Sequence, residues 1–279
     1  MIRTSRQLKA LVRNLSNGDS TRAQLIIRNY AMERFLERLS VSAYRDNLIL
    51  KGGALVSAIV GLGSRSTLDM DATIKNLPLT EESVRKIVGE IIAVQIDDGM
   101  VFEIKNIAPI MDDAEYPGIR VSLDTTLETM RTPLKIDFST GDVITPREVS
   151  YSFKLLFEDR TILILAYNLE TVLAEKIETL LARSTANSRM RDFYDVFVLE
   201  QLQSHNIDKT LLNAAFTNTN KKRGSFAVMS DMDNILNDVE CSPSMVALWK
   251  NYQRKFEYAS DIGWDEVMQA VRNLCYEIK

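Results

Sequence analysis

Two aspartates alternate with apolar residues in the segment LDMDATI, residues 68–74. Successive side chains of a β-strand point to opposite faces, so Asp69 and Asp71 are expected to share one face, about 7 Å apart. Two carboxylates at this spacing repel each other unless a cation lies between them. Carboxylate oxygens suit Mg²⁺, which typically binds one or two carboxylates together with substrate phosphates. The pair therefore indicates a metal site, with an exposed strand face carrying two acids as the alternative.

A second strand-like segment, LKIDF at residues 134–138, repeats the pattern with Lys135 and Asp137 on its polar face. If this strand neighbours the first, Asp137 becomes a third carboxylate beside Asp69 and Asp71. Three carboxylates can hold two metal ions, one activating an attacking hydroxyl and one bound to a triphosphate. Asp137 is then also the natural proton acceptor for the nucleophile. A surface acid is again the alternative, because the adjacency of the two strands is an assumption.

A glycine turn, Lys51-Gly52-Gly53, precedes an apolar helix-like run. Glycines let the backbone approach a ligand closely, and the N–H groups at a helix N-terminus bind phosphate. Between this turn and the aspartates, residues 63–67 supply one guanidinium, that of Arg65, and three hydroxyls, including that of Thr67. These groups suit phosphate contact, although a lone Gly-Gly pair is more often an ordinary strand-to-helix turn.

The elements that position these residues follow from the spacing of apolar side chains. Residues 1–46 are predicted to be helical, with a break and capping residues at 17–20, and a further helix is predicted to open at Thr80. The predicted strands cover residues 47–50, 68–75, 101–107, 119–127, 134–138 and 161–167, with loops at 112–118 and 139–146. The fold class is therefore α/β (α+β): a mixed β-sheet with flanking helices in residues 1–167, followed by a C-terminal helical bundle domain in residues 168–279.

Composition excludes several classes of protein. The 279 residues are 46% hydrophobic and 26% charged, as in ordinary globular proteins. A net charge of −4 argues against a generally basic nucleic-acid binder, so contact with a polyanion needs a local basic patch or bridging metal ions. The single histidine, His205, leaves little basis for a histidine zinc site or a Ser-His-Asp triad. Cys241 and Cys275 show no metal-ligand spacing, and no signal peptide or membrane span is evident, which favours a reduced, cytoplasmic protein.

The order of the motifs is more specific than any one of them. Gly52-Gly53, then Asp69-x-Asp71, then the distant Asp137 is typical of the polymerase-β-type nucleotidyltransferase superfamily. More narrowly, the segments YRDNLILKGG (residues 44–53) and RSTLDMD (residues 65–71) resemble the AbiEii toxin family. Those proteins are the toxin halves of AbiE-type abortive-infection and toxin–antitoxin systems.

Three further segments strengthen this resemblance. Residues 34–39 resemble the family's helix before the glycine turn, residues 173–183 resemble its third motif, and residues 188–195 resemble its fourth. The resemblance runs from about the first helix to Asp195, and the residues from His205 onward carry no recognised motif.

The resemblance implies a nucleotidyltransferase-like fold and a site drawn from both halves of the chain. Its metal ligands for Mg²⁺ or Mn²⁺ are Asp69, Asp71 and Asp137. Its nucleotide-binding positions are Gly52, Gly53, Arg65, Thr67, Arg191 and Asp195. Lys176 is expected to neutralise the charge of the leaving pyrophosphate and Asp192 to orient the site, so that the helical domain contributes both residues to the cleft. One departure is Ala54, which follows Gly53 where many relatives in the wider superfamily have serine, so backbone N–H groups must contact the phosphate.

The helical half also allows plainer interpretations of the same residues. Lys176 lies along an apolar stripe, so its ammonium either extends to solvent or reaches into a cleft. Arg191 and Asp195 are four residues apart and can form a simple pair on one helix face. The basic run at residues 221–224 can contact a nucleic-acid acceptor, although a solvated loop is the more common interpretation.

The function implied is a metal-dependent transfer of a nucleoside monophosphate from a nucleoside triphosphate to an RNA such as the tRNA 3′ end. The outcome implied is growth arrest by the toxin of a toxin–antitoxin or phage-defence system, with a cognate antitoxin encoded alongside. One alternative keeps the fold and changes the acceptor to a small molecule or a protein. Another is a non-catalytic nucleotide-binding module that regulates a partner.

Overall fold

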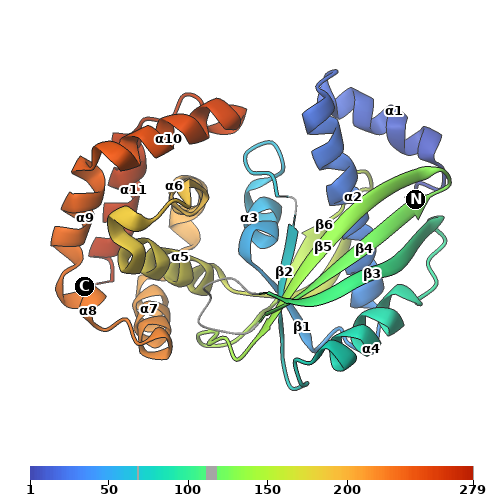
Figure 1. Cartoon of the computed structure of the whole chain (residues 1–279), viewed down its shortest axis with the longest axis horizontal. Helices are drawn as coiled ribbons and strands as arrows, with labels where there is room; N and C mark the ends of the chain where they lie inside the picture. Colours follow the sequence, from blue (N-terminus) through green and yellow to red (C-terminus); the bar gives the residue numbers. More distant parts are fainter. Residues whose placement is uncertain (68, 111–117, 279) are drawn as a thin grey trace. The chain divides into compact units, whose positions relative to one another are not determined.

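Seven strands form a mixed sheet in the part of the chain that the computed structural model describes, residues 1–67, 69–110 and 118–278. The strand order is β3-β4-β5-β2-β1-β7-β6 (Figure 1). The strands are β1 (Leu48–Lys51), β2 (Asp69–Ile74), β3 (Met100–Ile110), β4 (Gly118–Leu127), β5 (Met130–Thr140), β6 (Val149–Lys154) and β7 (Thr161–Ala166). β2 is parallel to β5 and β1 is parallel to β7, whereas the other neighbours are antiparallel. The predicted mixed sheet is confirmed.

The chain divides into two compact units, and the sheet belongs to the first of them. Helices α1 (Ser5–Ser16) and α2 (Ser20–Ser40) form the N-terminal part of this first unit. The predicted break between them is confirmed, because Asn17 ends α1 in the left-handed region at φ 50° and the Asp19 carboxylate accepts from the first N–H groups of α2. The helical prediction for residues 1–46 is too long, since α2 ends at Ser40 and turns follow. The unit also holds α3 (Gly52–Val60) as far as residue 58, together with α4 (Glu81–Ile92), which opens at Thr80 as predicted.

Alternating burial separates the two faces of the central strands. Met70, Ala72, Ile136 and Phe138 are fully buried. α2 packs against β5 and β7, and α4 packs against β3. Since successive side chains alternate, the aspartates of β2 and β5 lie on the opposite face of the sheet from these buried residues.

Some strands differ from their predicted extents. β3 and β5 are longer than predicted, because their pairing with β4 continues beyond the predicted ends, over residues 108–110 of β3 and residues 130–133 of β5. β6 is not predicted from the sequence, since this edge strand buries only Phe153 fully and its other side chains are at least partly exposed. Of the loop predicted over residues 112–118, only Gly118 lies within the described residues, and it belongs to β4.

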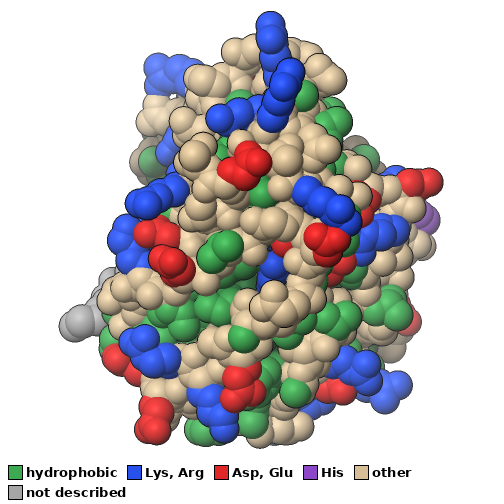
Figure 2. Space-filling view, turned by 90° about the vertical axis from the view of Figure 1, so that its right-hand side faces the viewer, with side chains coloured by type: hydrophobic (Ala, Val, Ile, Leu, Met, Phe, Trp, Pro, Cys, Tyr) green, Lys and Arg blue, Asp and Glu red, His purple; other side chains and the backbone are tan. Residues whose placement is uncertain are grey.

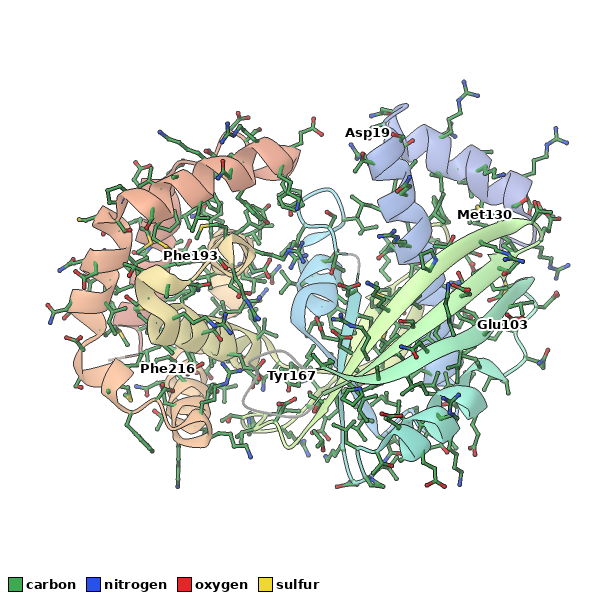
Figure 3. All side chains as sticks on the ribbon, in the orientation of Figure 1. Asp19, Glu103, Met130, Tyr167, Phe193 and Phe216 are labelled. Carbon is green, nitrogen blue, oxygen red and sulfur yellow. The ribbon has the colours of Figure 1, made fainter. Side chains whose placement is uncertain are left out.

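The second unit is helical, as predicted for the C-terminal half of the chain. Its helices are α5 (Leu169–Arg183), α6 (Met190–Gln203), α7 (Lys209–Arg223), α8 (Ala227–Ser230), α9 (Met232–Cys241), α10 (Pro243–Lys255) and α11 (Trp264–Tyr276). Large aromatic side chains fill its core, including Phe193 and Phe216 (Figure 3) and Trp249, all of them at most 1% exposed. None of the helices in the described residues is long and apolar enough to cross a membrane.

The division between the units follows the contacts of two short segments. The first unit comprises residues 1–58, 66–142 and 149–166, and the second comprises residues 59–65, 143–148 and 167–279. The main boundary thus lies one residue from the predicted division at 167. Residues 59–65 belong with the helices because Arg65 pairs with Asp195, and residues 143–148 do so because Thr145 is hydrogen-bonded to Asn168 and Thr171.

Candidate active site

The predicted adjacency of the two aspartate strands is confirmed. β2 and β5 pair in parallel with Asp71 beside Asp137 and Asp69 beside Lys135. Register neighbours on adjacent strands point to the same face, so the sheet places three aspartates of β2 and β5 on one surface. All three are partly exposed, whereas the residues between them are buried.

The glycine turn packs directly on one of these carboxylates. Gly52 has φ 62°, a left-handed conformation that favours glycine, and a Cβ at this position would overlap with the Asp71 carboxylate. The Gly53 N–H, in the first turn of α3, donates to Asp71 Oδ2 at 3.3 Å. The turn therefore joins the N-terminus of α3 to Asp71, while the phosphate contacts predicted for Gly52 and Gly53 stay predictions.

Two cations flank the aspartates in the same row of the sheet. Arg120 on β4 is the register neighbour of Asp137 and binds it through two hydrogen bonds, Nε to Oδ1 at 2.7 Å and Nη2 to Oδ2 at 2.6 Å. Lys51 on β1 is the register neighbour of Asp71. The order across four strands is thus Lys51, Asp71, Asp137, Arg120, which places a positive side chain at each end of the acidic pair.

A further carboxylate, Asp142, holds the Lys51 end of this row. Lys51 Nζ lies 2.6 Å from Asp142 Oδ2, and Ser139 Oγ donates to the same oxygen at 2.7 Å. Burial opposes ionisation of Asp142, but the Lys51 ammonium and the Ser139 and Thr73 hydroxyls outweigh it and lower the pKa of Asp142 to about 2. Lys51 is therefore held by a carboxylate that is ionised at neutral pH.

The donor chemistry of the surface suits a hard cation, although the three-carboxylate centre is not assembled. Among the described residues, no three His, Cys, Asp or Glu side chains are grouped to hold a metal ion, and both oxygens of Asp137 face Arg120. Asp69 and Asp71 retain the oxygen donors that Mg²⁺ and Mn²⁺ accept. Metal binding by Asp69, Asp71 and Asp137 stays a prediction. The Thr67 hydroxyl donates to the Asp69 carbonyl at 3.1 Å, and its predicted triphosphate contact is likewise untested.

The second unit gathers the residues of the third and fourth motifs. Lys176 Nζ on α5 lies 2.8 Å from Asp192 Oδ1 and 2.7 Å from Asp195 Oδ2, both on α6. Burial disfavours the charged ammonium, but the two carboxylates outweigh it and raise the pKa of Lys176. Lys176 thus neither extends into solvent nor lies unpaired. It is a buried cation held between two acids.

Arg65 completes this cluster through its bonds to Asp195. Its Nε donates to Asp195 Oδ1 at 2.6 Å and its Nη2 donates to Oδ2 at 3.1 Å. Burial opposes ionisation of Asp195, but Lys176 and Arg65 outweigh it and lower the pKa of Asp195. Arg65 is 1% exposed, so in this structure it anchors Asp195, and its predicted phosphate contact stays a prediction.

The simple helical pair considered for Arg191 and Asp195 is wrong. Asp195 is buried and bonds to Arg65 and Lys176, whereas the Arg191 guanidinium lies 5.9 Å from the centre of the Phe256 ring. The residue types at the motif positions are therefore brought together as a buried network, with Asp192 at its more exposed edge, 19% accessible. The nucleotide contacts predicted for Arg191 and Asp195 are not tested.

Three features of the site were not predicted from the sequence. They are Arg120, Asp142, and the position of the Lys51 cation beside Asp71. A signal for Arg120 exists in the sequence, because residues 119–127 alternate and Arg120 falls on their polar face. Its register beside Asp137 requires the β4–β5 pairing, which no local pattern states. Asp142 follows the end of β5 in a loop-like segment and carries no periodic signal.

Comparisons with known proteins bear on the fold and the family. The family described as Nucleotidyl transferase AbiEii toxin, Type IV TA system, matches residues 34–270. No curated protein matches the chain. Two solved structures are similar, each with 13% identity, a TM-score of 0.52 and coverage of 91% of this chain. One is a candidate nucleotidyltransferase from H. pylori, covered over 96% of its length, and the other is JHP933 from Helicobacter pylori, covered over 93%. At this identity they show the fold alone.

Proposed function

Because the chain belongs to the AbiEii nucleotidyl transferase toxin family, we propose that it transfers a nucleoside monophosphate from a nucleoside triphosphate to an RNA. The specific acceptor proposed is the 3′ end of a tRNA. The observation that carries the chemistry is the register of Asp71 beside Asp137 with Asp69 on the same face, directly against the glycine turn that opens α3. Paired carboxylates on a sheet face, next to a helix N-terminus, suit a metal-bound triphosphate.

The proposed roles follow from the chemistry of each group. Asp69 and Asp71 would hold Mg²⁺ or Mn²⁺, which when bound supplies positive charge to the triphosphate. The acceptor hydroxyl oxygen forms a bond to the α-phosphorus while the bond to the pyrophosphate oxygen breaks. Asp137 takes the hydroxyl proton, which requires that it leave Arg120. Arg120 stays on the same surface as the reacting groups.

Residues of the second unit are proposed to manage charge. Lys176 neutralises the negative charge of the leaving pyrophosphate, and Asp192 orients the site. The two-sided pairing of Lys176 supports this role, because Asp195 can keep the ammonium in place when Asp192 moves. Arg65 and Asp195 serve in this proposal as the support that fixes Lys176, since both are almost fully buried.

The family also implies a biological setting, namely a toxin neutralised by a cognate antitoxin. We propose that this chain is the toxin of such a pair and that nucleotide transfer to RNA arrests growth. A host with this chain under an inducible promoter tests the setting. Growth arrest is expected with the wild type, and Asp71→Asn is expected to relieve it. Arrest that persists in Asp69→Ala and in Asp71→Asn assigns the effect to a non-catalytic, nucleotide-binding module.

A label-transfer assay tests the chemistry directly. Purified protein is incubated with each of the four nucleoside triphosphates labelled at the α-phosphate, with Mg²⁺ and total RNA. Labelled RNA is expected with one or more nucleotides, and Asp71→Asn is expected to abolish it. Label on a small molecule or on protein, with none on RNA, replaces the RNA acceptor by the other acceptor class. No transfer to any acceptor overturns the enzymatic proposal.

A further inference from the structure

Helices α1 and α2 carry a concentration of positive charge that the proposed chemistry does not use. Residues 1–32 contain six arginine or lysine side chains and one acidic side chain, Asp19, although the whole chain has a net charge of −4. The family match begins at residue 34. This charge is therefore a feature of this chain outside the matched segment.

One face of α1 presents three of these cations. Leu8 and Val12 are buried, and α1 packs against α2. Arg6, Lys9 and Arg13 are exposed, and they fall within two turns, so that Arg6 and Arg13 align about 10 Å apart with Lys9 beside them. Helix α1 is thus fixed by its apolar side and offers a row of positive charge to solvent.

Of the six cations, Arg3 pairs with Asp97, and the other five form no ion pair with the described residues. In residues 1–67, 69–110 and 118–278, no carboxylate lies within 4.0 Å of Arg6, Lys9, Arg13, Arg22 or Arg28. The next arginine along α2 behaves differently, since Arg34 is buried and pairs with Glu37. Blue side chains gather at the upper end of Figure 2, where α1 and the start of α2 lie. The positive charge at this surface is available to a partner.

The basic helix is attached to the strand that leads to the aspartates. The Ser5 N–H and hydroxyl donate to Glu128 Oε2, at 3.0 and 2.6 Å, in the turn between β4 and β5. Met130, at the start of β5, lies near the N-terminal end of α1 in Figure 3. β5 begins at this turn and contains Asp137, so a single strand connects the turn that holds α1 to the carboxylates.

The polar face of β5 continues the positive charge along this path. Arg131 and Lys135 are exposed and alternate in phase with Asp137, so they share its face. At about 3.3 Å per residue they lie roughly 20 and 7 Å from Asp137. Lys135 is also the register neighbour of Asp69. Positive side chains therefore recur along β5 on the face of the carboxylates, starting beside the turn that holds α1.

We propose that the exposed face of α1, continued by Arg131 and Lys135, binds the phosphate backbone of the acceptor nucleic acid. The identification of the bound strand as the acceptor rests on the proposed function. Backbone phosphates are bound by arginine, lysine and neutral donors such as asparagine, and the exposed Asn14 on α1 is such a donor. A protein interface of comparable size favours aromatic residues at its centre, and the sequence of α1 contains none.

A binding experiment without nucleotide or metal separates this surface from the chemistry. Fluorescently labelled tRNA is titrated, in EDTA and over a range of salt, with the wild type and with a variant carrying Arg6→Gln and Arg13→Gln. Glutamine keeps helix propensity. The control carries Arg85→Gln and Lys86→Gln, which removes two exposed cations from α4 in the same unit. We expect the α1 variant to lose affinity by about five- to tenfold at moderate salt and to lower the salt slope by about 1.5, with no such change in the control.

Two results would overturn the proposal. One is an α1 variant that binds tRNA with the wild-type affinity and salt slope. The other is an α1 variant that loses binding to vesicles of anionic lipid while keeping its affinity for tRNA, which assigns the surface to a membrane. Thermal unfolding checks that both variants fold. Because binding is measured without nucleotide, normal tRNA binding by a chain that transfers no label counts against the proposed function alone.

Discussion

Arg120 and Asp137 face each other across β4 and β5 and form a two-bond ion pair, with nitrogen-to-oxygen distances of 2.7 and 2.6 Å. Asp137 is the residue proposed to accept the nucleophile's proton. Both of its carboxylate oxygens are bound by a cation that belongs to the protein. Any metal ion or substrate that engages Asp137 must therefore compete with the Arg120 guanidinium, and charge-assisted pairs of this geometry are among the stronger hydrogen bonds.

Arg120→Gln is expected to tighten metal binding. Without the guanidinium, Asp137 is free to join Asp69 and Asp71, so we expect Mn²⁺ affinity to rise by about tenfold, equivalent to about 1.4 kcal/mol. Titration calorimetry with Mn²⁺ alone measures this. Lys135→Gln is the control, because it removes an exposed cation from the same face of β5 without breaking a pair with Asp137. If Arg120→Gln binds Mn²⁺ no more tightly than Lys135→Gln, the competition does not operate.

Gly52→Ala is expected to damage activity far more than stability. The new Cβ would overlap with the Asp71 carboxylate, which must move, and the positive φ adds backbone strain of about 1 kcal/mol. We expect transfer activity to fall by at least about 100-fold, since small misplacements of reacting groups have effects of this size. Gly18→Ala is the matched control, because Gly18 has φ 86° with no atom within 4 Å of a Cβ. Comparable activities in the two variants would show that the position of Asp71 is not critical.

The residues that could be predicted from sequence are those whose local pattern fixes their direction. Alternation within β2 and β5 places Asp69, Asp71 and Asp137 on strand faces, and the structure brings these faces together. The partners of these residues could not be predicted in the same way. Arg120 meets Asp137 through strand register, and register depends on which strands pair, which is a property of the whole sheet.

The pairing of Asp195 in the second unit also could not be predicted from local spacing. The spacing of Arg191 and Asp195 favours a local pair, yet Asp195 is buried and bonds Arg65, which is 130 residues away in the chain. A buried carboxylate needs strong partners, and here tertiary packing supplies Arg65 and Lys176 in place of the local arginine. Local spacing identifies which residues can pair, and burial decides which of them do.

Asp195→Asn is expected to destabilise the second unit strongly. The change leaves the buried Arg65 and Lys176 without their shared anion, and breaking one member of a buried ion pair costs about 3–5 kcal/mol. Urea unfolding followed by tryptophan fluorescence reports on this unit, because both tryptophans of the chain, Trp249 and Trp264, lie in it. We expect a lower unfolding midpoint in Asp195→Asn.

Asp192→Asn is the matched comparison for that change. Asp192 is partly exposed, and Lys176 keeps its contact with Asp195 when Asp192 is neutralised. We expect a stability loss of under about 1 kcal/mol together with a clear loss of nucleotide transfer. Equal stability losses in the two variants would contradict the assignment of Asp195 to support and Asp192 to the reaction.

Glu33 on α2 is expected to make the first unit less stable as pH rises. Burial raises the pKa of Glu33 from 4.5 to about 7, although it accepts hydrogen bonds from the Leu156 N–H and from Asn29. The folded state therefore holds this proton more tightly than the unfolded state. The stabilising effect of this bound proton is complete below pH 4.5 and is lost as pH rises through 7, by at most about 3 kcal/mol.

Glu33→Gln keeps an acceptor and removes the titration, so the free energy of unfolding should fall less steeply between pH 5 and 8 than in the wild type. Glu103→Gln, at an exposed position on β3 (Figure 3), should keep the wild-type slope. Parallel slopes for the wild type and Glu33→Gln would show that Glu33 titrates alike in both states.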